Sequence, residues 1–301
     1  QDGLTGLSNF KRYSLRINND LKVTEKIDLG VDISLKQSER EAPVDNALIW
    51  NSINRLPPIH ATRFSNGFYA YGGGRNPLAY TTPDVGGQNR ETSNYAMVNL
   101  KANYEPIDGL NFNIAFAPIL NQDFVKDFTR KIDYYDYGAD TPRGSDPQIS
   151  SLDEGFSRTF ETYFKAIGTY EKAFESHYLK LLGGFDQTFF RYDNFNAFRD
   201  GFSNPYFQQL NSGSAARQTN EGTASEWALR SFFGRLNYNF KERYLFEANI
   251  RYDGSSRFNS VSRWGVFPSG SAAWRISNEP FFDVPFIDDL KLRGSWGKLG
   301  N

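Results

Sequence analysis

Two histidines are the side chains best suited to proton transfer in this sequence of 301 residues, which contains no cysteine. His60 lies in the proline-flanked stretch LPPIHATR, and His177 begins an apolar segment just after a turn. A hydrolase needs a nucleophile beside a histidine that a third group orients, and neither histidine has an evident partner of this kind. We therefore expect both histidines to be structural or exposed, and we predict no catalytic residue and no enzyme.

Acidic side chains gather in one stretch, DFVKDFTRKIDYYDYGAD, where their oxygens suit Ca²⁺. Their spacing matches no EF-hand loop, so we expect a solvated loop without metal ligands. The five aspartates of this stretch are Asp123, Asp127, Asp133, Asp136 and Asp140.

A glycine triplet, Gly72 to Gly74, is the nearest approach to a phosphate-binding loop. Such a loop also needs a lysine and a following helix, which this stretch lacks. We therefore predict a flexible loop here and no bound cofactor.

Aromatic residues are concentrated in three stretches that we expect to be loops: Phe64 to Tyr71, Tyr134 to Tyr137 and Phe195 to Phe207. Such rings can stack on sugars or on peptide side chains. They can equally pack on one another or on a partner protein. The sequence leaves both interpretations open and the substrate-binding residues unknown.

The elements that would position these residues are strands of alternating character. In IDLGVDISLK, Ile27 to Lys36, apolar residues occupy every second position and the positions between them are polar or glycine. Successive side chains of a strand point to opposite faces, so the pattern predicts one apolar and one polar face. Five further segments repeat it, with no charged residue on their apolar faces: Arg12 to Asn18, Ala96 to Tyr104, Leu110 to Phe116, Tyr244 to Asp253 and Leu290 to Trp296.

Less regular segments bring the total to about ten strands, many near the length that a tilted strand needs to cross a bilayer. Aromatic residues near strand ends, such as Tyr244, Tyr252 and Trp296, fit girdles at the two membrane interfaces. A soluble β-sandwich is the alternative at this point, although its strands are usually shorter. The less regular segments are Phe160 to Tyr170, His177 to Thr188, Trp227 to Tyr238 and Trp264 to Ile276.

Loop length decides between these two alternatives. Short turns are expected around residues 21–26, 105–109, 171–176 and 240–243, and longer loops at 37–94, 118–157, 193–226 and 254–263. Short turns on one side and long loops on the other are typical of outer-membrane barrels. The sequence therefore predicts an all-β fold, a transmembrane antiparallel β-barrel, with residues 277–289 as a short helical or irregular cap on the short-turn side.

Composition excludes several other classes of protein. No stretch approaches the roughly 18 apolar residues of a transmembrane helix. The formal net charge of −1 gives no reason to expect a nucleic-acid partner. The first ten residues lack the pattern of a signal peptide.

Several stretches resemble the SusC/RagA family of TonB-dependent outer-membrane transporters of Bacteroidetes-type bacteria. The stretch RGSWGKLGN, Arg293 to Asn301, is similar to a signature of that family. RYDGSSRF, from Arg251, and RWGVFPSGSAAWRISNEPFF, from Arg263, match the preceding hairpin. FGRLNYNFKERYLFEANI and FKRYSLRINNDLKVTEKIDLG fit two further blocks. The resemblance covers the whole chain and is strongest from Ser231 onward.

This resemblance implies a 22-stranded barrel with a plug inside it, a TonB-binding segment and a SusD-like surface lipoprotein as a lid. It also implies TonB-dependent import of a bulky nutrient, such as a glycan, oligosaccharide or peptide. Residues 1–301 contain no counterpart of the plug or of the TonB-binding segment. We therefore expect a partial barrel domain over residues 1–301, from the middle of a longer protein in the outer membrane.

The alternative function is that of a passive porin or structural barrel, which would use the same strands without a plug. In either case the charged residues on the polar strand faces would face water or a plug. These residues are Arg16, Asp28, Asp32, Lys101, Glu247, Arg251 and Arg293.

Overall fold

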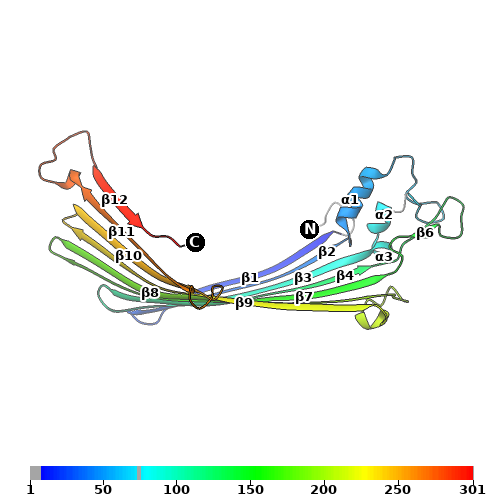
Figure 1. The fold of residues 1–301 in the computed structure, drawn as a ribbon, viewed down its shortest axis with the longest axis horizontal. Coiled ribbons are helices and arrows are strands. Elements are labelled where there is room, and N and C mark those ends of the chain that lie inside the picture. The colour runs from blue at the N-terminus through cyan, green and yellow to red at the C-terminus, as the bar shows by residue number, and fades with distance from the viewer. Residues whose placement is uncertain (1–7, 73–75, 301) are drawn as a thin grey trace.

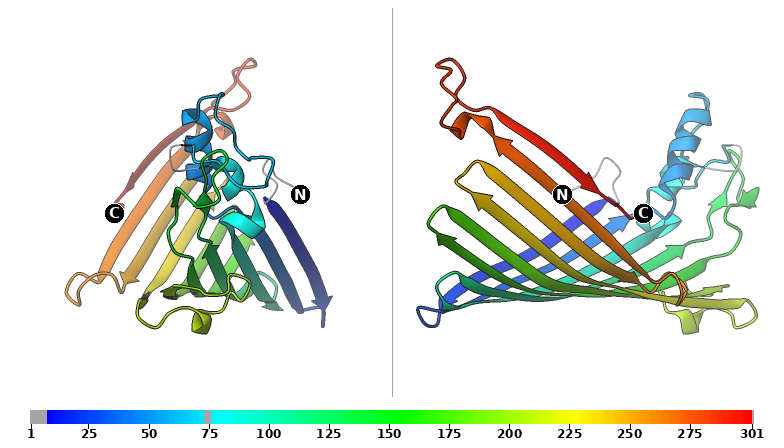
Figure 2. Two further views of the ribbon diagram at one scale, coloured as in Figure 1. Left: turned by 90° about the vertical axis from the view of Figure 1, so that its right-hand side faces the viewer. Right: turned by 60° about the vertical axis from the view of Figure 1, so that its left-hand side comes forward.

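The computed structural model describes residues 8–72 and 76–300, and most of them form one antiparallel sheet (Figure 1). Its ten strands follow the order β1-β2-β3-β4-β7-β8-β9-β10-β11-β12, and Figure 2 shows that the sheet is strongly curved. All ten predicted strands are confirmed. Their bounds are β1 (Asn9–Lys22), β2 (Ile27–Ala42), β3 (Gly87–Ile107), β4 (Leu110–Thr129), β7 (Ser151–Phe174), β8 (His177–Asp200), β9 (Gln218–Phe240), β10 (Tyr244–Ser255), β11 (Trp264–Arg275) and β12 (Lys291–Gly297).

The connections between strands sort by length, as predicted. The ends joined by residues 23–26, 108–109, 175–176 and 241–243 lie on one side, at the left of Figure 1. Longer loops, at residues 43–86, 130–150 and 201–217, join the opposite ends. Gly109 makes one of the short turns with φ of +80°, where an added Cβ would collide with the backbone oxygen of Glu171.

The predicted long loops are nevertheless too long, because the strands continue well beyond the alternating segments. β4 extends to Thr129 and β8 to Asp200, so Asp123, Asp127 and Phe195 lie on strands. Where both faces of a strand meet water or other loops, neither face has to be apolar. The alternating pattern therefore ends before the strand does.

Register shows that the apolar side chains form a belt on one face of the sheet. Residues paired across an antiparallel ladder lie on the same face. One row of such pairs crosses nine strands and contains only hydrophobic residues: Leu21, Leu29, Ala102, Ile114, Ala166, Phe185, Phe232, Tyr252 and Val266.

The belt crosses the strands obliquely. On β1 the row passes through Leu21, at the short-turn end of the apolar stretch. On β10 it passes through Tyr252, at the long-loop end of the stretch that begins with Tyr244 beside the short turn. The belt thus shifts by about eight residues over seven strand-to-strand steps. With a rise of about 3.3 Å and a strand spacing of about 4.8 Å, the strands are tilted by roughly 40°. Tilts of about 35–45° are those of transmembrane barrels.

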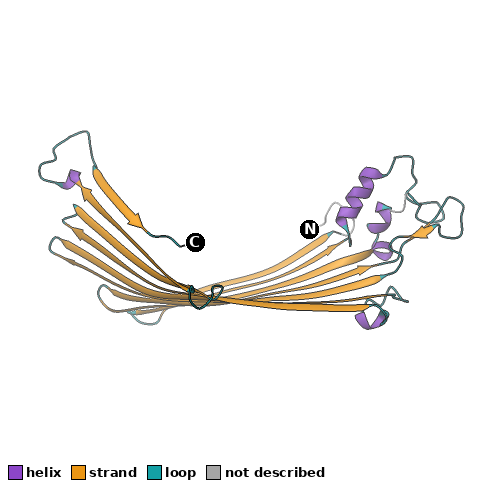
Figure 3. Cartoon of the chain, viewed as in Figure 1, coloured by secondary structure: helices purple, strands orange, loops and turns teal. Residues whose placement is uncertain are grey.

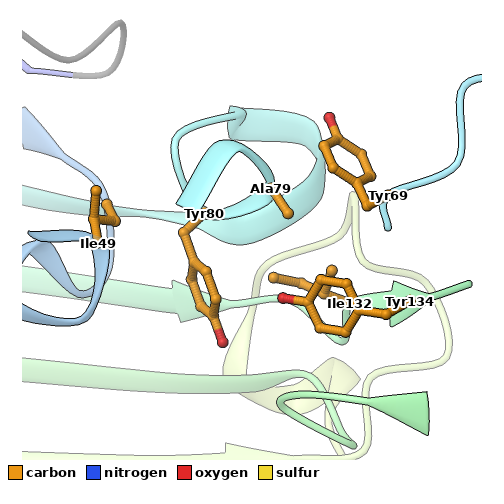
Figure 4. Close-up of a cluster of buried hydrophobic side chains, with 6 residues drawn as sticks. All are labelled: Ile49, Tyr69, Ala79, Tyr80, Ile132 and Tyr134. Carbon is orange, nitrogen blue, oxygen red and sulfur yellow. The ribbon is translucent and has the colours of Figure 1, made fainter. Parts of the chain in front are cut away.

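The two longest loops pack against each other above the sheet. They carry α1 (Asn46–Arg55), α2 (Pro77–Tyr80), α3 (Pro83–Gly86), β5 (Asp133–Tyr134) and β6 (Gly144–Ser145), and α1, α2 and α3 lie together at one end of the strands (Figure 3). Their shared core, drawn in Figure 4, contains Ile49, Tyr69, Ala79, Tyr80, Ile132 and Tyr134. None of the helices in the described residues is long and apolar enough to cross a membrane.

Irregular chain follows β11 on the short-turn side, as predicted for residues 277–289. It begins with the single 3-10 turn η2 (Ile276–Asn278). Glu279 anchors this cap, because its carboxylate accepts hydrogen bonds from Tyr244 Oη at 2.7 Å and Trp274 Nε1 at 2.9 Å. The guanidinium of Arg243 lies 3.2 Å from the same carboxylate.

Candidate functional site: the concave polar wall

The polar face of the sheet is hollowed. A cavity of about 750 Å³ opens on it between β1 and β8. Among the side chains that line it are Lys22, Asp28, Lys101, Asn103, Asn113 and Lys165. Register places all seven charged residues predicted to face water or a plug on this face. The polar face is therefore the inner wall of the barrel and the candidate functional surface.

One group of charges lies on β1, β2 and β3 and is called the Lys101 cluster. Lys101 Nζ lies 3.0 Å from Asp32 Oδ2 and 3.7 Å from Asp20 Oδ1. The Asp32 carboxylate also accepts hydrogen bonds from the side-chain amides of Asn18 at 2.7 Å and Asn99 at 3.0 Å. Each charge in the cluster is compensated, yet Lys101 is exposed enough to exchange partners with water or a solute.

A second group lies on β8, β9 and β10 and is called the Arg251 cluster. The Arg251 guanidinium lies 3.1 Å from Asp253 Oδ1 and 3.6 Å from Asp186 Oδ2. It also lies 5.3 Å from the ring centroid of Phe233, within cation–π range. The two clusters share one cross-strand row, which contains Lys101, Lys165, Asp186 and Asp253. Because the row crosses the belt obliquely, the Arg251 cluster lies nearer the long loops than the Lys101 cluster does.

Amide side chains continue the polar wall toward the short turns. The Glu247 carboxylate accepts hydrogen bonds from Asn237 at 2.8 Å and Asn249 at 2.9 Å. Arg235 donates in turn to the Asn249 side-chain oxygen at 2.6 Å. Such a ladder of donors and acceptors can hydrogen-bond a polar surface or hydrated solute, but it presents no activated nucleophile.

Toward the long loops the wall becomes aromatic and cationic. Trp227 stacks on Phe190 with ring centroids 5.1 Å apart, and the Arg257 guanidinium lies 4.5 Å over the Trp227 ring. A second cavity, of about 800 Å³, opens beside them and is lined by Arg257, Arg263 and Lys298. The sequence does not distinguish Trp227 and Phe190 from the other aromatic residues of the strands. Only the register places them on the polar face.

The two histidines lie at opposite ends of the strands. His60 is exposed in the loop after α1, on the long-loop side. His177 starts β8 on the other side, where it lies against Phe174 and Phe240, and its Nδ1 is 2.7 Å from Tyr238 Oη. His177 is therefore part of an aromatic girdle on the apolar face, which is one of the two placements expected for it.

The five aspartates do not converge on one point. Asp123 and Asp127 lie on β4, while Asp133 pairs with Lys131 and Asp136 pairs with Arg143. Asp140 is exposed. Within residues 8–72 and 76–300, no group of three or more acidic or histidine side chains is arranged to hold a metal ion. The expectation of one solvated loop is wrong for Asp123 and Asp127, because β4 continues through them.

The aromatic stretches pack mainly on one another. Phe68 stacks on Tyr135 at 4.0 Å, and burial in the loop core raises the pKa of the Tyr134 hydroxyl far above its usual value. In the third stretch, Phe202 is buried against Phe128 and Leu152. Other rings, Tyr137, Tyr206 and Phe207, are exposed. Of the glycine triplet, Gly73 and Gly74 lie outside the described residues.

Residues 45–300 match the family model described as "TonB dependent receptor-like, beta-barrel". The chain belongs to this family. Its members are outer-membrane β-barrels, which agrees with the oblique apolar belt and the concave polar wall. They are receptors for transport rather than enzymes. The predicted fold class and outer-membrane location are thereby confirmed.

Known members with which the chain shares sequence support the resemblance to SusC/RagA. TonB-dependent receptor P3 of Formosa agariphila is 28% identical over 100% of this chain and 30% of that protein. TonB-dependent receptor SusC of Bacteroides thetaiotaomicron is 43% identical over 40% of this chain and 12% of that protein. The chain thus spans about 30% or less of the length of these relatives.

A solved structure described as the RagAB peptide transporter has the same fold. It superposes with a TM-score of 0.76 at 23% identity, covering 96% of this chain and 33% of the other. A second structure, the RagAB peptide importer in a "closed-closed" state, gives a TM-score of 0.75 at 24% identity. The chain is therefore folded like a section of a larger barrel.

Proposed function

We propose that this chain forms part of the barrel wall of a transporter that imports a bulky nutrient across the outer membrane with energy delivered through TonB. The observation that carries this proposal is the match of residues 45–300 to the TonB-dependent receptor barrel. The paired charges of the concave wall support it, because an energy-driven path needs an inner surface that can exchange hydrogen bonds without holding a solute permanently.

In this mechanism the nutrient binds between the external loops, a SusD-like surface lipoprotein and a plug. Pulling on the plug from the periplasm then opens a path along the wall. The Lys101 and Arg251 clusters lie on opposite parts of that wall and would contact the plug or the passing solute. Because their charges are paired within the wall, a departing plug leaves no bare charge behind.

The nutrient is a glycan, oligosaccharide or peptide. The RagAB structures are described as those of a peptide transporter or peptide importer, which makes peptides one candidate for this chain. The cationic and aromatic cavity beside Trp227 suits either class, since arginine binds carboxylates and an indole ring can stack on a sugar.

The test uses the complete gene in its own bacterium. Uptake of labelled peptides and oligosaccharides is measured in the parent, in a strain lacking this gene and in a strain lacking TonB. Import by this protein predicts that both deletions abolish uptake of the same nutrient. Uptake that depends on the gene but persists without TonB would instead identify a passive porin.

The lipoprotein partner is tested separately. The affinity-tagged full-length protein is purified in mild detergent, and co-purifying proteins are identified by mass spectrometry. A surface lipoprotein in near-equal amount is expected. Its absence, with TonB-dependent uptake intact, would remove the lid from the proposal and leave the energy coupling.

A further inference from the structure

Three arginines mark the outer edge of the apolar belt on neighbouring strands. On the convex, apolar face of β7, β8 and β9, the first charged residues beyond the belt in the direction of the long loops are Arg158, Arg191 and Arg230. Together they are called the arginine group. On β1 to β4 the cross-strand row of Arg158 carries only uncharged residues, Tyr13, Gln37, Asn94 and Gln122. Cations of the convex face also occur on other strands, such as Lys11 on β1, which lies opposite Glu39 on β2.

The strand tilt places this group at the membrane surface. On β9 the belt starts at Phe240, and Arg230 lies ten residues further along the strand. At about 3.3 Å per residue and a tilt of roughly 40°, this distance is about 25 Å along the membrane normal, the usual height of a barrel's apolar band. Arg230 thus lies at the upper edge of the band, and Arg158 and Arg191 lie slightly above it.

Arg158 and Arg191 have acidic partners. Arg158 Nη2 lies 3.0 Å from Asp193 Oδ2, while Arg191 lies 2.8 Å from Asp193 and 3.3 Å from Glu226. Two guanidinium groups thus share two carboxylates. The four charges balance, so this part of the group is neutral overall.

Arg230 is different. Its one hydrogen bond among the described residues runs from Nε to the neutral Gln187 Oε1, at 2.9 Å. Its row neighbours beyond Gln187 and Gly254 are Phe164 and Trp264, and Phe232 lies two residues below on the same strand. Arg230 is thus an exposed cation with aromatic neighbours and no carboxylate partner among the described residues, and its counter-charge has to come from outside the chain. At this depth that counter-charge comes from the lipid headgroups.

We propose that the arginine group binds the phosphate of a phosphorylated glycolipid in the outer leaflet. Arg230 supplies the bidentate contact, because a guanidinium fork matches two phosphate oxygens. Arg158 and Arg191, whose charges Asp193 and Glu226 balance, offer N–H donors one layer higher, where the sugar hydroxyls lie. Phe164, Phe232 and Trp264 contact the first carbons of the acyl chains. The sector β7–β9 is thus a lipid-docking surface, separate from the transport path on the opposite face.

The test measures lipid retention by the full-length protein in detergent. Native mass spectrometry follows the bound fraction as monophosphoryl lipid A is titrated, beside the same glycolipid with its phosphate removed. Variants are Arg230→Gln and the triple change Arg158→Gln, Arg191→Gln, Arg230→Gln. Arg235→Gln is the matched control, because it removes one arginine from the same strand but from the concave face. Heat-modifiable gel mobility verifies that each variant is folded.

We expect Arg230→Gln to weaken binding of the phosphorylated glycolipid by about tenfold, the triple variant to weaken it further, and Arg235→Gln to leave it unchanged. Removing the lipid phosphate should match the Arg230→Gln loss in the parent protein. Equal retention of the two glycolipids by the parent, or equal retention by parent and triple variant, would overturn the proposal. Displacement of the lipid by millimolar inorganic phosphate would also overturn it, since the site would then be one for free phosphate.

Discussion

The convex and concave faces of this sheet are built by the same strands, one residue out of phase, and they obey different rules. On the convex face, the cross-strand row that begins at Leu21 on β1 and ends at Val266 on β11 contains no charged residue. On the concave face, the next row contains Asp20, Lys101, Lys165, Asp186 and Asp253. The contrast teaches that the environment, and not the strand, selects the side chain.

The difference also concerns how charge is managed. Concave charges are paired within the wall, as Lys101 is with Asp32 at 3.0 Å. On the convex face, charge begins only where the belt ends, and there Arg230 has no acidic partner among the described residues. Lipid tails cannot solvate an ion, whereas water inside the barrel can. A cation therefore has a very different cost on the two faces.

The largest expected effect comes from moving charge onto the belt. Ile114 lies midway along the belt on the convex face of β4, and the residue is 47% exposed. Ile114→Lys should lower the free energy of unfolding from a bilayer by about 2–4 kcal/mol, because a lysine near mid-bilayer faces lipid. Urea titration of the full-length protein in liposomes, followed by tryptophan fluorescence, measures the change.

The matched control is one residue away. Asn113→Lys places the same side chain on the concave face, beside the cavity that Lys22 and Lys165 already line. We expect a change well below that of Ile114→Lys. Similar losses for both variants would mean that the concave face is as dry as the convex one, and the assignment of the two faces would fail.

An effect of intermediate size, on the attachment of the cap, is expected at Glu279. Hydrogen bonds from Tyr244 and Trp274, with the nearby charge of Arg243, lower the pKa of Glu279 below its ordinary 4.5. A carboxyl with a lowered folded pKa stabilises the folded state fully above its unfolded pKa. That stabilisation is lost as pH falls below about 4.5 and through the folded value. Below this range the cap should detach from Trp274.

Glu279→Gln removes the charge at every pH. In the parent, the fluorescence of Trp274 should change as pH is lowered from 7 to 3. In Glu279→Gln, most of this change should be absent. Trp274→Phe identifies the reporter. A pH response of equal size in Glu279→Gln would show that another group controls the cap.

Much of the fold was readable from the sequence because the membrane imposes a simple pattern. Ile27 to Lys36 alternates without exception, and this alternation predicts the start of β2. Prediction failed beyond the membrane, where β8 continues to Asp200 through residues that do not alternate. The shared core that contains Ile49 and Ile132 from two different loops was equally unreadable, because no local pattern links residues so far apart in sequence.

For the residues of the candidate site, the sequence predicts which face of the sheet each lies on but not which residues each contacts. Alternation placed Lys101 and Arg251 on the polar side, and the structure has both there. It did not reveal that Arg251 contacts Asp186, 65 positions earlier, since that pair depends on the register of β8, β9 and β10. For the same reason, Arg230 and Arg235 look alike in the sequence, although they project from opposite faces.

The smallest expected effect is at the Arg251 cluster. Arg251 and Asp253 form an ion pair in which 47% and 36% of the side chains are exposed, and such pairs contribute about 0–1 kcal/mol. Arg251→Gln should therefore leave folding stability within about 1 kcal/mol of the parent in the same urea titration. The glutamine keeps hydrogen-bonding capacity beside Asp186 and Asp253, whose carboxylates can turn to water. A loss as large as that of Ile114→Lys would show instead that the cluster is sealed from water. The concave wall would then need its ion pairs for folding as much as the convex face needs its apolar belt.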